Sequence, residues 1–246
     1  KAGRIAAEGL TRVAAQGNHA VIFEVNSETD FVAKNEQFLH VLDVLQASLL
    51  ETKPASLEEA LKVSTPEGTV EEVITNATAT IGEKISFRRI DVVEKKDDEI
   101  FGTYMHMGGK ISAVVVLKGT QDAQIAKNIA MQVASMSPVY VSQSEIPSDV
   151  VEHERELQMQ MMQNDPKMAG KPEKVLQGIL KGKVDKHFKD LCLNDQEYFL
   201  EPKQKVSQFL KENGAEAVCF VRYQAGEGIE KKEENFAEEV MSQIKG

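Results

Sequence analysis

The chain has 246 residues, of which 41% are apolar and 28% are charged, and its formal net charge at pH 7 is −10. This composition is typical of a folded globular protein and excludes disordered and fibrous classes. The negative charge argues against direct nucleic-acid binding, because backbone phosphates require a basic face. The longest apolar run, Ile111 to Leu117, is far shorter than the roughly 18 residues that cross a bilayer, so we expect no membrane contact.

The cysteines and the first residues bear on the cellular compartment. Cys192 and Cys219 each stand in an apolar string without CxxC spacing, which predicts buried free thiols in a reducing compartment. No apolar stretch of a signal peptide follows Lys1, and Lys1 itself suggests a processed or truncated form. We therefore expect a cytoplasmic protein.

The first elements form an alternating and then a helical pattern. Residues 6–25 predict a β-hairpin around the turn Gln16-Gly17-Asn18. Apolar residues then recur at three- and four-residue steps and predict a helix over about 30–52. We expect Ser27 or Thr29 to cap its first turn. A short acidic helix begins at Ser56.

The central segment changes from helical to strand periodicity. A helix after Pro66-Glu67-Gly68 ends at Gly82, a residue suited to the left-handed conformation at a helix C-terminus. From Lys84 the apolar period is two, and its change of phase predicts a bulge near Arg88-Arg89. The remaining patterns of this segment predict strands at about 100–106 and 111–118 and a helix at about 122–135.

Residues 148–192 predict two helices, 148–163 and 172–192, that form an antiparallel hairpin. The apolar residues expected to face each other across this hairpin are Val150, Leu157 and Met161 on the first helix and Leu176, Leu180, Val184, Phe188 and Leu191 on the second.

After Pro202 the globular pattern returns. It predicts a helix at about 203–212 and a strand at 217–223, which needs the strands near 100–118 as neighbours. An acidic helix from about 233 carries the apolar stripe Phe236, Val240 and Ile244.

Together these elements predict an α+β fold. We expect two subdomains, each a small antiparallel sheet packed on helices, with an inserted helical hairpin (a coiled coil) and a C-terminal helix. The expected bounds are 1–98 for the first subdomain, 99–143 with 200–228 for the discontinuous second, 144–199 for the hairpin and 229–246 for the last helix module.

Asp30 and Phe31 are the leading candidate site residues, because they stand at the entrance of the 30–52 helix, before its buried stripe begins. A carboxylate beside a large apolar ring on a rigid helix start suits insertion into another protein. The alternative is that Asp30 stabilises the helix dipole and Phe31 closes the local core.

Searches for catalytic motifs give little. Gly108-Gly109-Lys110-Ile111 lacks the upstream glycine, the Ser/Thr and the following helix of a phosphate-binding loop. His153 and His187 could meet across the hairpin, where a surface pair is a simpler interpretation than a metal site. His106, at a strand end, is either satisfied locally or functional. We expect no catalytic residue, cofactor or metal.

Several segments, in order along the chain, resemble the elongation factor Ts family. The nearest resemblance is 23–36, FEVNSETDFVAKNE, and Ile81-Gly82-Glu83-Lys84, Tyr104-Met105-His106 and Gly226-Glu227-Gly228 resemble later landmarks of that family. The resemblance covers essentially the whole chain. It implies a guanine-nucleotide exchange factor for the GTPase elongation factor Tu, and a small N-terminal module upstream of Lys1.

By this resemblance, Asp30 and Phe31 intrude beside the partner's magnesium and nucleotide, and His106 presses near its phosphate-binding loop. The implied partner-binding residues are Thr29, Asp30, Phe31, Val32, Gly82, His106 and Phe199. A homodimer through the hairpin is a further expectation.

Two other functions stay open. One is an adaptor in which the helical hairpin is the working part and Phe31 belongs to the core. The other is an enzyme of unrecognised type centred on His106 and nearby carboxylates. Release of GDP from elongation factor Tu distinguishes all three.

Overall fold

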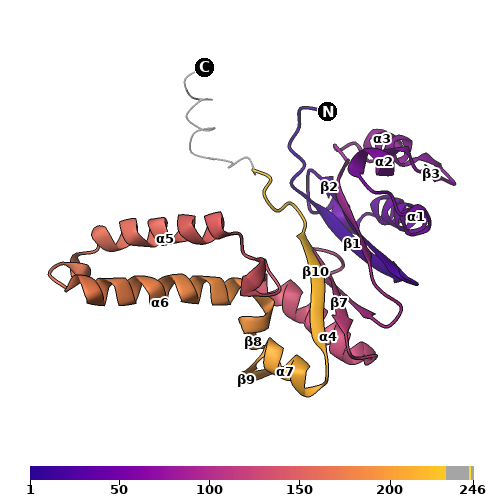
Figure 1. The fold of residues 1–246 in the computed structure, drawn as a ribbon. Helices are drawn as coiled ribbons and strands as arrows, with labels where there is room; N and C mark the ends of the chain where they lie inside the picture. The colour runs from indigo at the N-terminus through magenta and orange to yellow at the C-terminus, as the bar shows by residue number, and fades with distance from the viewer. Residues whose placement is uncertain (231–243, 245–246) are drawn as a thin grey trace. The chain divides into compact units, whose positions relative to one another are not determined.

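The fold was taken from a computed structural model, which describes residues 1–230 and Ile244 (Figure 1). The predicted helix from about 233 therefore lies outside the described residues, apart from Ile244. Two compact units make up the chain. The first contains Lys1–Glu94, Met105–Ser112 and the described residues from Tyr223 onward, and the second contains Lys95–Tyr104 and Ala113–Arg222.

The first unit is built on an antiparallel sheet with the strand order β1-β2-β5. Its strands are β1 (Glu8–Gln16), β2 (His19–Ser27) and β5 (Ser86–Glu94). The β1–β2 hairpin and its turn confirm the first prediction. The bulge is confirmed as well: Glu24 pairs with Arg89 and Val25 with Phe87, which leaves Arg88 as the extra residue on β5.

Three helices supply the rest of the first core. They are α1 (Glu36–Thr52), α2 (Leu57–Lys62) and α3 (Val70–Ile81), with the short strands β3 (Ser64–Thr65) and β4 (Gly68–Thr69) between α2 and α3. Phe38, Leu42, Leu45 and Leu49 of α1 are fully buried in one cluster with Phe23 of the sheet. Phe23 in turn stacks on Phe87, with 5.8 Å between the ring centroids. The apolar stripe of α1 thus holds the helix on the sheet.

The start of α1 differs from the prediction. A 3₁₀ turn, η1 (Val32–Lys34), precedes α1, and the cap is Asn35, whose side chain accepts from the N–H groups of Gln37 and Phe38. Neither Ser27 nor Thr29 caps the helix, because the Ser27 hydroxyl donates to the Thr29 carbonyl and the Thr29 hydroxyl donates to Glu83.

A second antiparallel sheet has the order β10-β7-β6. It consists of β6 (Ile100–His106), β7 (Ile111–Lys118) and β10 (Glu216–Gln224). The pairing of β10 with β7 confirms that the late strand returns to the strands near 100–118. The helix α4 (Ala123–Met136) belongs to the second unit, and its residues Ile129 and Val133 are fully buried. Gly102 of β6 lies so close to α4 that an added Cβ would stand 2.0 Å from the Ala126 carbonyl oxygen.

The segment after the hairpin is only partly as predicted. The expected helix over 203–212 is the shorter α7 (Val206–Glu212). Residues Glu201–Lys205 instead form strand β9, which pairs with β8 (Glu197–Tyr198). Tyr198 is buried and stacks on Phe209 of α7, with 4.2 Å between ring centroids, so tertiary packing fixes this ribbon.

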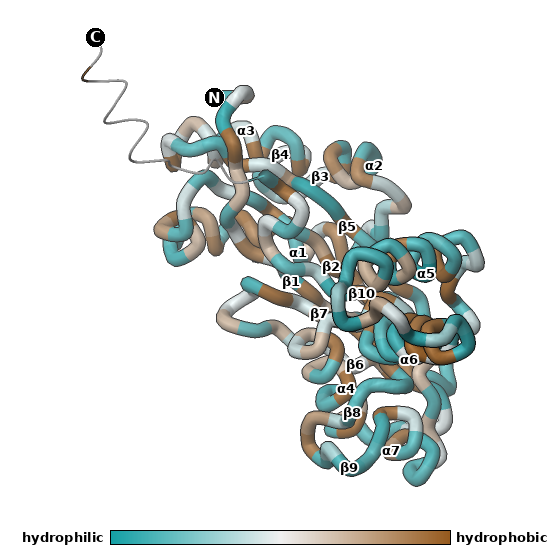
Figure 2. The backbone as a smooth tube through the Cα atoms, turned by 90° about the vertical axis from the view of Figure 1, so that its left-hand side faces the viewer, coloured by the Kyte–Doolittle hydropathy of each residue, from teal (hydrophilic) through white to brown (hydrophobic). Residues whose placement is uncertain are grey.

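The helical hairpin consists of α5 (Ser148–Gln163) and α6 (Glu173–Leu191), joined through η3 (Pro166–Met168). Figure 1 shows the two helices side by side, and the colouring of Figure 2 shows that both carry hydrophilic and hydrophobic residues. Leu180, Val184 and Phe188 of α6 are buried between them, as predicted.

The predicted stripe of α5 is right at Val150, which is partly buried and packs against the hairpin cluster, and wrong at its other two residues. Leu157 is 42% exposed and Met161 is 63% exposed, whereas Met162 is buried. The shielded face follows Val151, Glu154, Gln158 and Met162 at three- and four-residue steps. Two of these residues are polar, and the Gln158 amide donates to the Glu154 carboxylate at 2.8 Å. An apolar pattern could not reveal a contact face that contains a hydrogen-bonded polar pair.

The mixture of helices with small antiparallel sheets confirms the α+β class. Both cysteines are free, but only Cys192 is buried; Cys219 is partly exposed, which corrects the prediction for that thiol. Within the described residues, no helix is long and apolar enough to cross a membrane.

Candidate functional site

The segment after β2 places Asp30 and Phe31 on the surface. Phe31 is 82% exposed, the largest exposed fraction among the exposed large apolar residues of the described chain, and Asp30 is exposed as well. Val32, the next residue, is buried with the first core. The alternative in which Phe31 closes the local core is therefore wrong. The core holds Val32, and the ring before it projects outward.

A carboxylate clamp fixes the chain immediately before Asp30. Glu83 Oε1 accepts from the N–H groups of Glu28 and Thr29 at 3.1 and 2.9 Å, and Oε2 accepts from the Thr29 hydroxyl at 2.7 Å. Hydrogen bonds to an ionised carboxylate are roughly twice as strong as neutral ones. Thr29 therefore serves as an anchor for the exposed pair that follows it.

A second carboxylate, that of Glu28, joins the same two segments, with the acid now on the segment after β2 and the N–H donor on the segment after α3. The Glu28 carboxylate accepts from the Lys84 N–H at 3.0 Å and lies 3.5 Å from the Arg4 guanidinium. Gly82, just before the clamp, ends α3 with φ +87°, as predicted for a left-handed C-cap. The clamp thus joins the two segments that carry Phe31 and Gly82.

His106 lies at the end of β6 and is exposed. It opens the turn to β7, where the Gly109 N–H donates to the His106 carbonyl at 3.1 Å. Gly109 is tied to β1, because its carbonyl accepts from the Thr11 N–H at 2.6 Å and from the Thr11 hydroxyl at 2.8 Å. Thr29–Val32, Gly82 and His106 all belong to the first unit.

Phe199 belongs to the second unit, in the short link between β8 and β9. Its ring is partly exposed and packs edge-on against Tyr198. Its N–H donates to the side chain of Gln132 at 2.9 Å, and Gln132 is fully buried on α4. Gln132 also donates to Gln196 and to the Glu197 carbonyl, so a buried amide network holds the backbone at Phe199.

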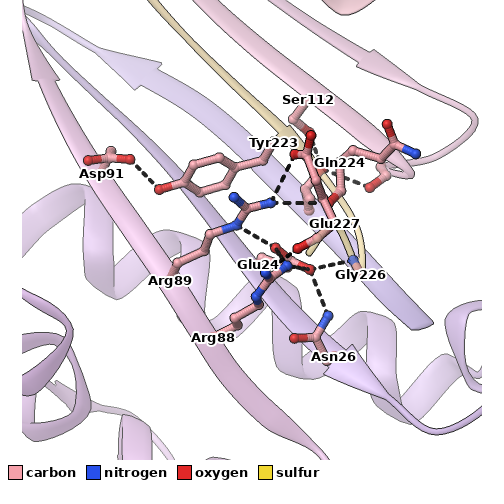
Figure 3. A network of polar contacts seen from close by, with 12 residues as sticks. Glu24, Asn26, Arg88, Arg89, Asp91, Ser112, Tyr223, Gln224, Gly226 and Glu227 are labelled. Carbon is pink, nitrogen blue, oxygen red and sulfur yellow. Dashed lines mark hydrogen bonds and ion pairs between the residues drawn. The ribbon is translucent and has the colours of Figure 1, made fainter. Parts of the chain in front are cut away.

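A buried carboxylate that the sequence pattern did not single out lies at Glu24, in the middle of β2 (Figure 3). Its oxygens accept from Arg89 Nε at 2.5 Å and from Arg88 at 3.1 and 3.2 Å. They also accept from the Asn26 amide and from the Gly226 N–H, each at 2.7 Å. Every lone pair of this buried charge is therefore matched, as burial requires.

The signal for Glu24 was present in the sequence. A single acid stands within the apolar strand 21–25, and the dipeptide Arg88-Arg89 falls at the bulge of the strand that pairs with it. Only the register, however, reveals that the acid and the two arginines meet.

The same network ties the end of β10 and the residues after it to the first sheet. The Arg88 guanidinium donates to the Glu227 carbonyl, Arg89 donates to the Gln224 carbonyl, and the Arg89 guanidinium lies 4.0 Å from the Tyr223 ring centroid. The Tyr223 hydroxyl donates to Asp91 (Figure 3). Burial, with Asp91 beside it, raises the pKa of Tyr223 well above its usual range, so the hydroxyl keeps its proton and remains a donor.

The histidines of the hairpin do not form the pair that the sequence allowed. His187 Nε2 lies 3.6 Å from the Glu154 carboxylate, and no contact joins it to His153. No group of three or more His, Cys, Asp or Glu side chains in the described part of the chain could hold a metal ion. At Asp30 and Phe31 the described surface exposes a carboxylate followed directly by an apolar ring.

The comparison with protein families covers most of the segments described above. Residues 28–227 match the family model described as elongation factor TS. The match includes the clamp at 28–29 and 83–84, the His106 turn and the Phe199 link. It also includes Arg88 and Arg89 of the Glu24 network. This chain belongs to the elongation factor Ts family, and its role is that of a translation elongation factor.

Proposed function

We propose that this chain binds the GDP-bound GTPase elongation factor Tu and accelerates release of GDP, so that GTP can load. The observation that carries the proposal is the pair Asp30–Phe31. It is exposed, while the residues before and after it are held by Glu83 and by the core. A rigidly mounted ring loses little conformational entropy when it docks, which favours insertion into a partner.

The mechanism is a thermodynamic coupling between two ligands of the GTPase. If this chain and GDP each disturb the geometry that the other needs, each weakens the other's binding by the same factor. A coupling of about 3 kcal/mol lowers nucleotide affinity by roughly 150-fold. No covalent step is required, so we propose a protein-binding role and not catalysis by this chain.

The proposed roles follow the placement of the residues. Asp30 and Phe31 displace groups around the partner's Mg²⁺, the cation that neutralises the nucleotide phosphates. His106 presses on the phosphate-binding loop and withdraws its N–H donors. Thr29 and Val32 hold the pair in place, and Gly82 and Phe199 supply further contacts. We place this activity in the cytoplasm, without nucleic acid or membrane as direct partners.

The test is the release of a fluorescent GDP analogue from purified elongation factor Tu, followed by stopped flow against the concentration of this chain. The wild-type chain should accelerate release. Phe31→Ala should lower the second-order rate constant by about 10- to 150-fold, because burial of a Phe side chain stabilises a complex by roughly 1.5–3 kcal/mol. Asp30→Ala should lower it in the same direction.

The matched control is Leu57→Ala, which truncates another exposed apolar residue of the first unit, on α2. It should leave release within about twofold of wild type. Binding without acceleration by the wild-type chain would favour the adaptor, in which the hairpin does the work. Neither binding nor acceleration would leave the enzyme as the remaining alternative.

A further inference from the structure

The turn between β6 and β7 places a methionine in a conformation that methionine does not favour. Met107 has φ +51° and Gly108 has φ +71°, and the Gly109 N–H donates to the His106 carbonyl across them. Positive φ at both central residues is the signature of a type I′ turn, whose first central position strongly prefers Asn, Asp or Gly. A long side chain there crowds its own backbone.

The Met107 side chain lies outside the buried core. Met107 is 69% exposed, and Met105, two residues earlier, is 39% exposed. A buried methionine would offset the unfavourable backbone by removing apolar surface from water, but this one leaves most of its surface in contact with solvent. Asn or Gly at 107 would suit the turn better, so stability of this chain alone does not explain the residue.

The backbone that carries Met107 is nevertheless held firmly. Gly109 makes two hydrogen bonds to Thr11, and an added Cβ at Gly109 would stand 2.4 Å from the Thr11 carbonyl oxygen. On the other side of the turn, the Lys110 carbonyl accepts from the Ala225 N–H at 2.9 Å. An exposed apolar side chain in an unfavourable conformation on a fixed mount is typical of a contact residue.

We propose that Met107 is a further contact residue for the GTPase, and that its thioether packs into an apolar recess beside the surface that His106 contacts. The inference rests on the proposed function and adds a residue to the same site. Methionine suits such a contact, because its unbranched side chain adapts to irregular pockets. The contact contributes affinity in the complexes with and without nucleotide alike. It therefore sets the concentration of this chain that gives half-maximal acceleration of GDP release, and it does not set the rate of release at saturation.

Met107→Gly separates a contact from a structural role, because glycine suits the turn and removes the side chain. We expect its melting temperature to equal or exceed that of wild type. In the GDP-release assay, the half-saturating concentration should rise about tenfold, while the rate at saturation stays within about twofold. Met107→Asn, which also tolerates positive φ, should behave in the same way.

The matched control is Lys53→Gly. Lys53 is another exposed non-glycine residue with positive φ, +53°, at the end of α1. It should show the same or higher melting temperature with an unchanged half-saturating concentration.

Three results would overturn the inference. One is a half-saturating concentration of Met107→Gly within twofold of wild type. The second is a clear loss of its thermal stability, which would make the side chain structural. The third is a wild-type chain that does not accelerate GDP release; that result removes the proposed function as well, whereas the first two leave it intact.

Discussion

Glu83 holds Thr29 at two points, since one carboxylate oxygen accepts the Thr29 N–H at 2.9 Å and the other accepts its hydroxyl at 2.7 Å. These residues are 54 positions apart in the chain, and Asp30 and Phe31 follow Thr29 directly. The exposed pair is therefore held in place by hydrogen bonds between the segment that follows β2 and the segment that follows α3.

Glu83→Ala should slow GDP release although Glu83 need not touch the partner. Loss of three charge-assisted hydrogen bonds frees the segment that carries Phe31. Binding must then order this segment, and the conformational entropy lost in ordering it weakens the complex. We expect a second-order rate constant about 5- to 30-fold lower, which corresponds to roughly 1–2 kcal/mol. The control is Glu71→Gln, an exposed acid on α3, which should change the rate less than twofold. An unchanged rate for Glu83→Ala would show that the clamp does not position Phe31.

Glu24→Gln should destabilise the first unit strongly. The substitution removes the negative charge that two arginines share and leaves an amide N–H₂ facing other donors. Removing one partner of a buried ion pair costs about 3–5 kcal/mol. Because Arg88 and Arg89 are about a quarter exposed to solvent, we expect roughly 2–3 kcal/mol in urea unfolding.

The comparison variant for Glu24 is Glu216→Gln. It breaks the ion pair with Lys118, in which both side chains are more than half exposed. Its effect on unfolding should stay below about 0.5 kcal/mol. Equal effects of the two substitutions would mean that the Glu24 network contributes no more than a surface pair.

Leu180→Ala should destabilise the α5–α6 hairpin, whereas Leu157→Ala should not. Leu180 is 4% exposed between the helices and Leu157 is 42% exposed. A buried Leu→Ala change costs about 2–5 kcal/mol, since it combines lost transfer energy with a cavity. Hydrogen exchange of the hairpin amides should report this difference. GDP release should remain within about threefold of wild type for both variants, and a near-complete loss for Leu180→Ala would shift weight to the adaptor function.

His40 should make the stability of the first unit depend on pH. Its hydrogen bond to Glu67, Nε2 to Oε1 at 2.7 Å, and the negative charge of Glu67 raise the pKa of His40 in the folded state above its ordinary value. The pair therefore stabilises the fold fully below the unfolded pKa, about 6.5, and this contribution is lost as the pH rises through the higher folded value.

The measurement for His40 is the difference in melting temperature between wild type and His40→Asn at several pH values. The difference should be larger at pH 5.5 than at pH 8 and should shrink with added salt, because the pair is exposed. A difference that is the same at both pH values would contradict the contribution of the Glu67 pair.

The sequence alone was enough to predict most elements and the family. Periodicities of 3.6 and 2 decided α1, α3, α4, α6 and the strands of both large sheets, because each element must bury a continuous apolar face. The change of phase near Arg88 was enough to place the bulge, since an extra residue is the simplest way to keep both apolar sets inward. Gly82 predicted the end of α3, because glycine readily adopts the left-handed backbone conformation found at helix C-termini.

Tertiary structure decided the features that local patterns do not carry. The cap of α1 is Asn35 and not Ser27 or Thr29. The Ser27 hydroxyl donates to a nearby carbonyl, and the Thr29 hydroxyl donates to a carboxylate distant in the sequence. The inner face of α5 contains Glu154 and Gln158, whose hydrogen bond makes polar residues acceptable there. The meeting of Glu24 with Arg88, Arg89 and Gly226 needed the strand register and the return of the chain after β10. In each case the deciding interaction joins polar groups that are distant in the sequence or depend on packing, so the tertiary structure determines which partners meet. The burial of apolar residues, in contrast, can be predicted from their spacing along the chain.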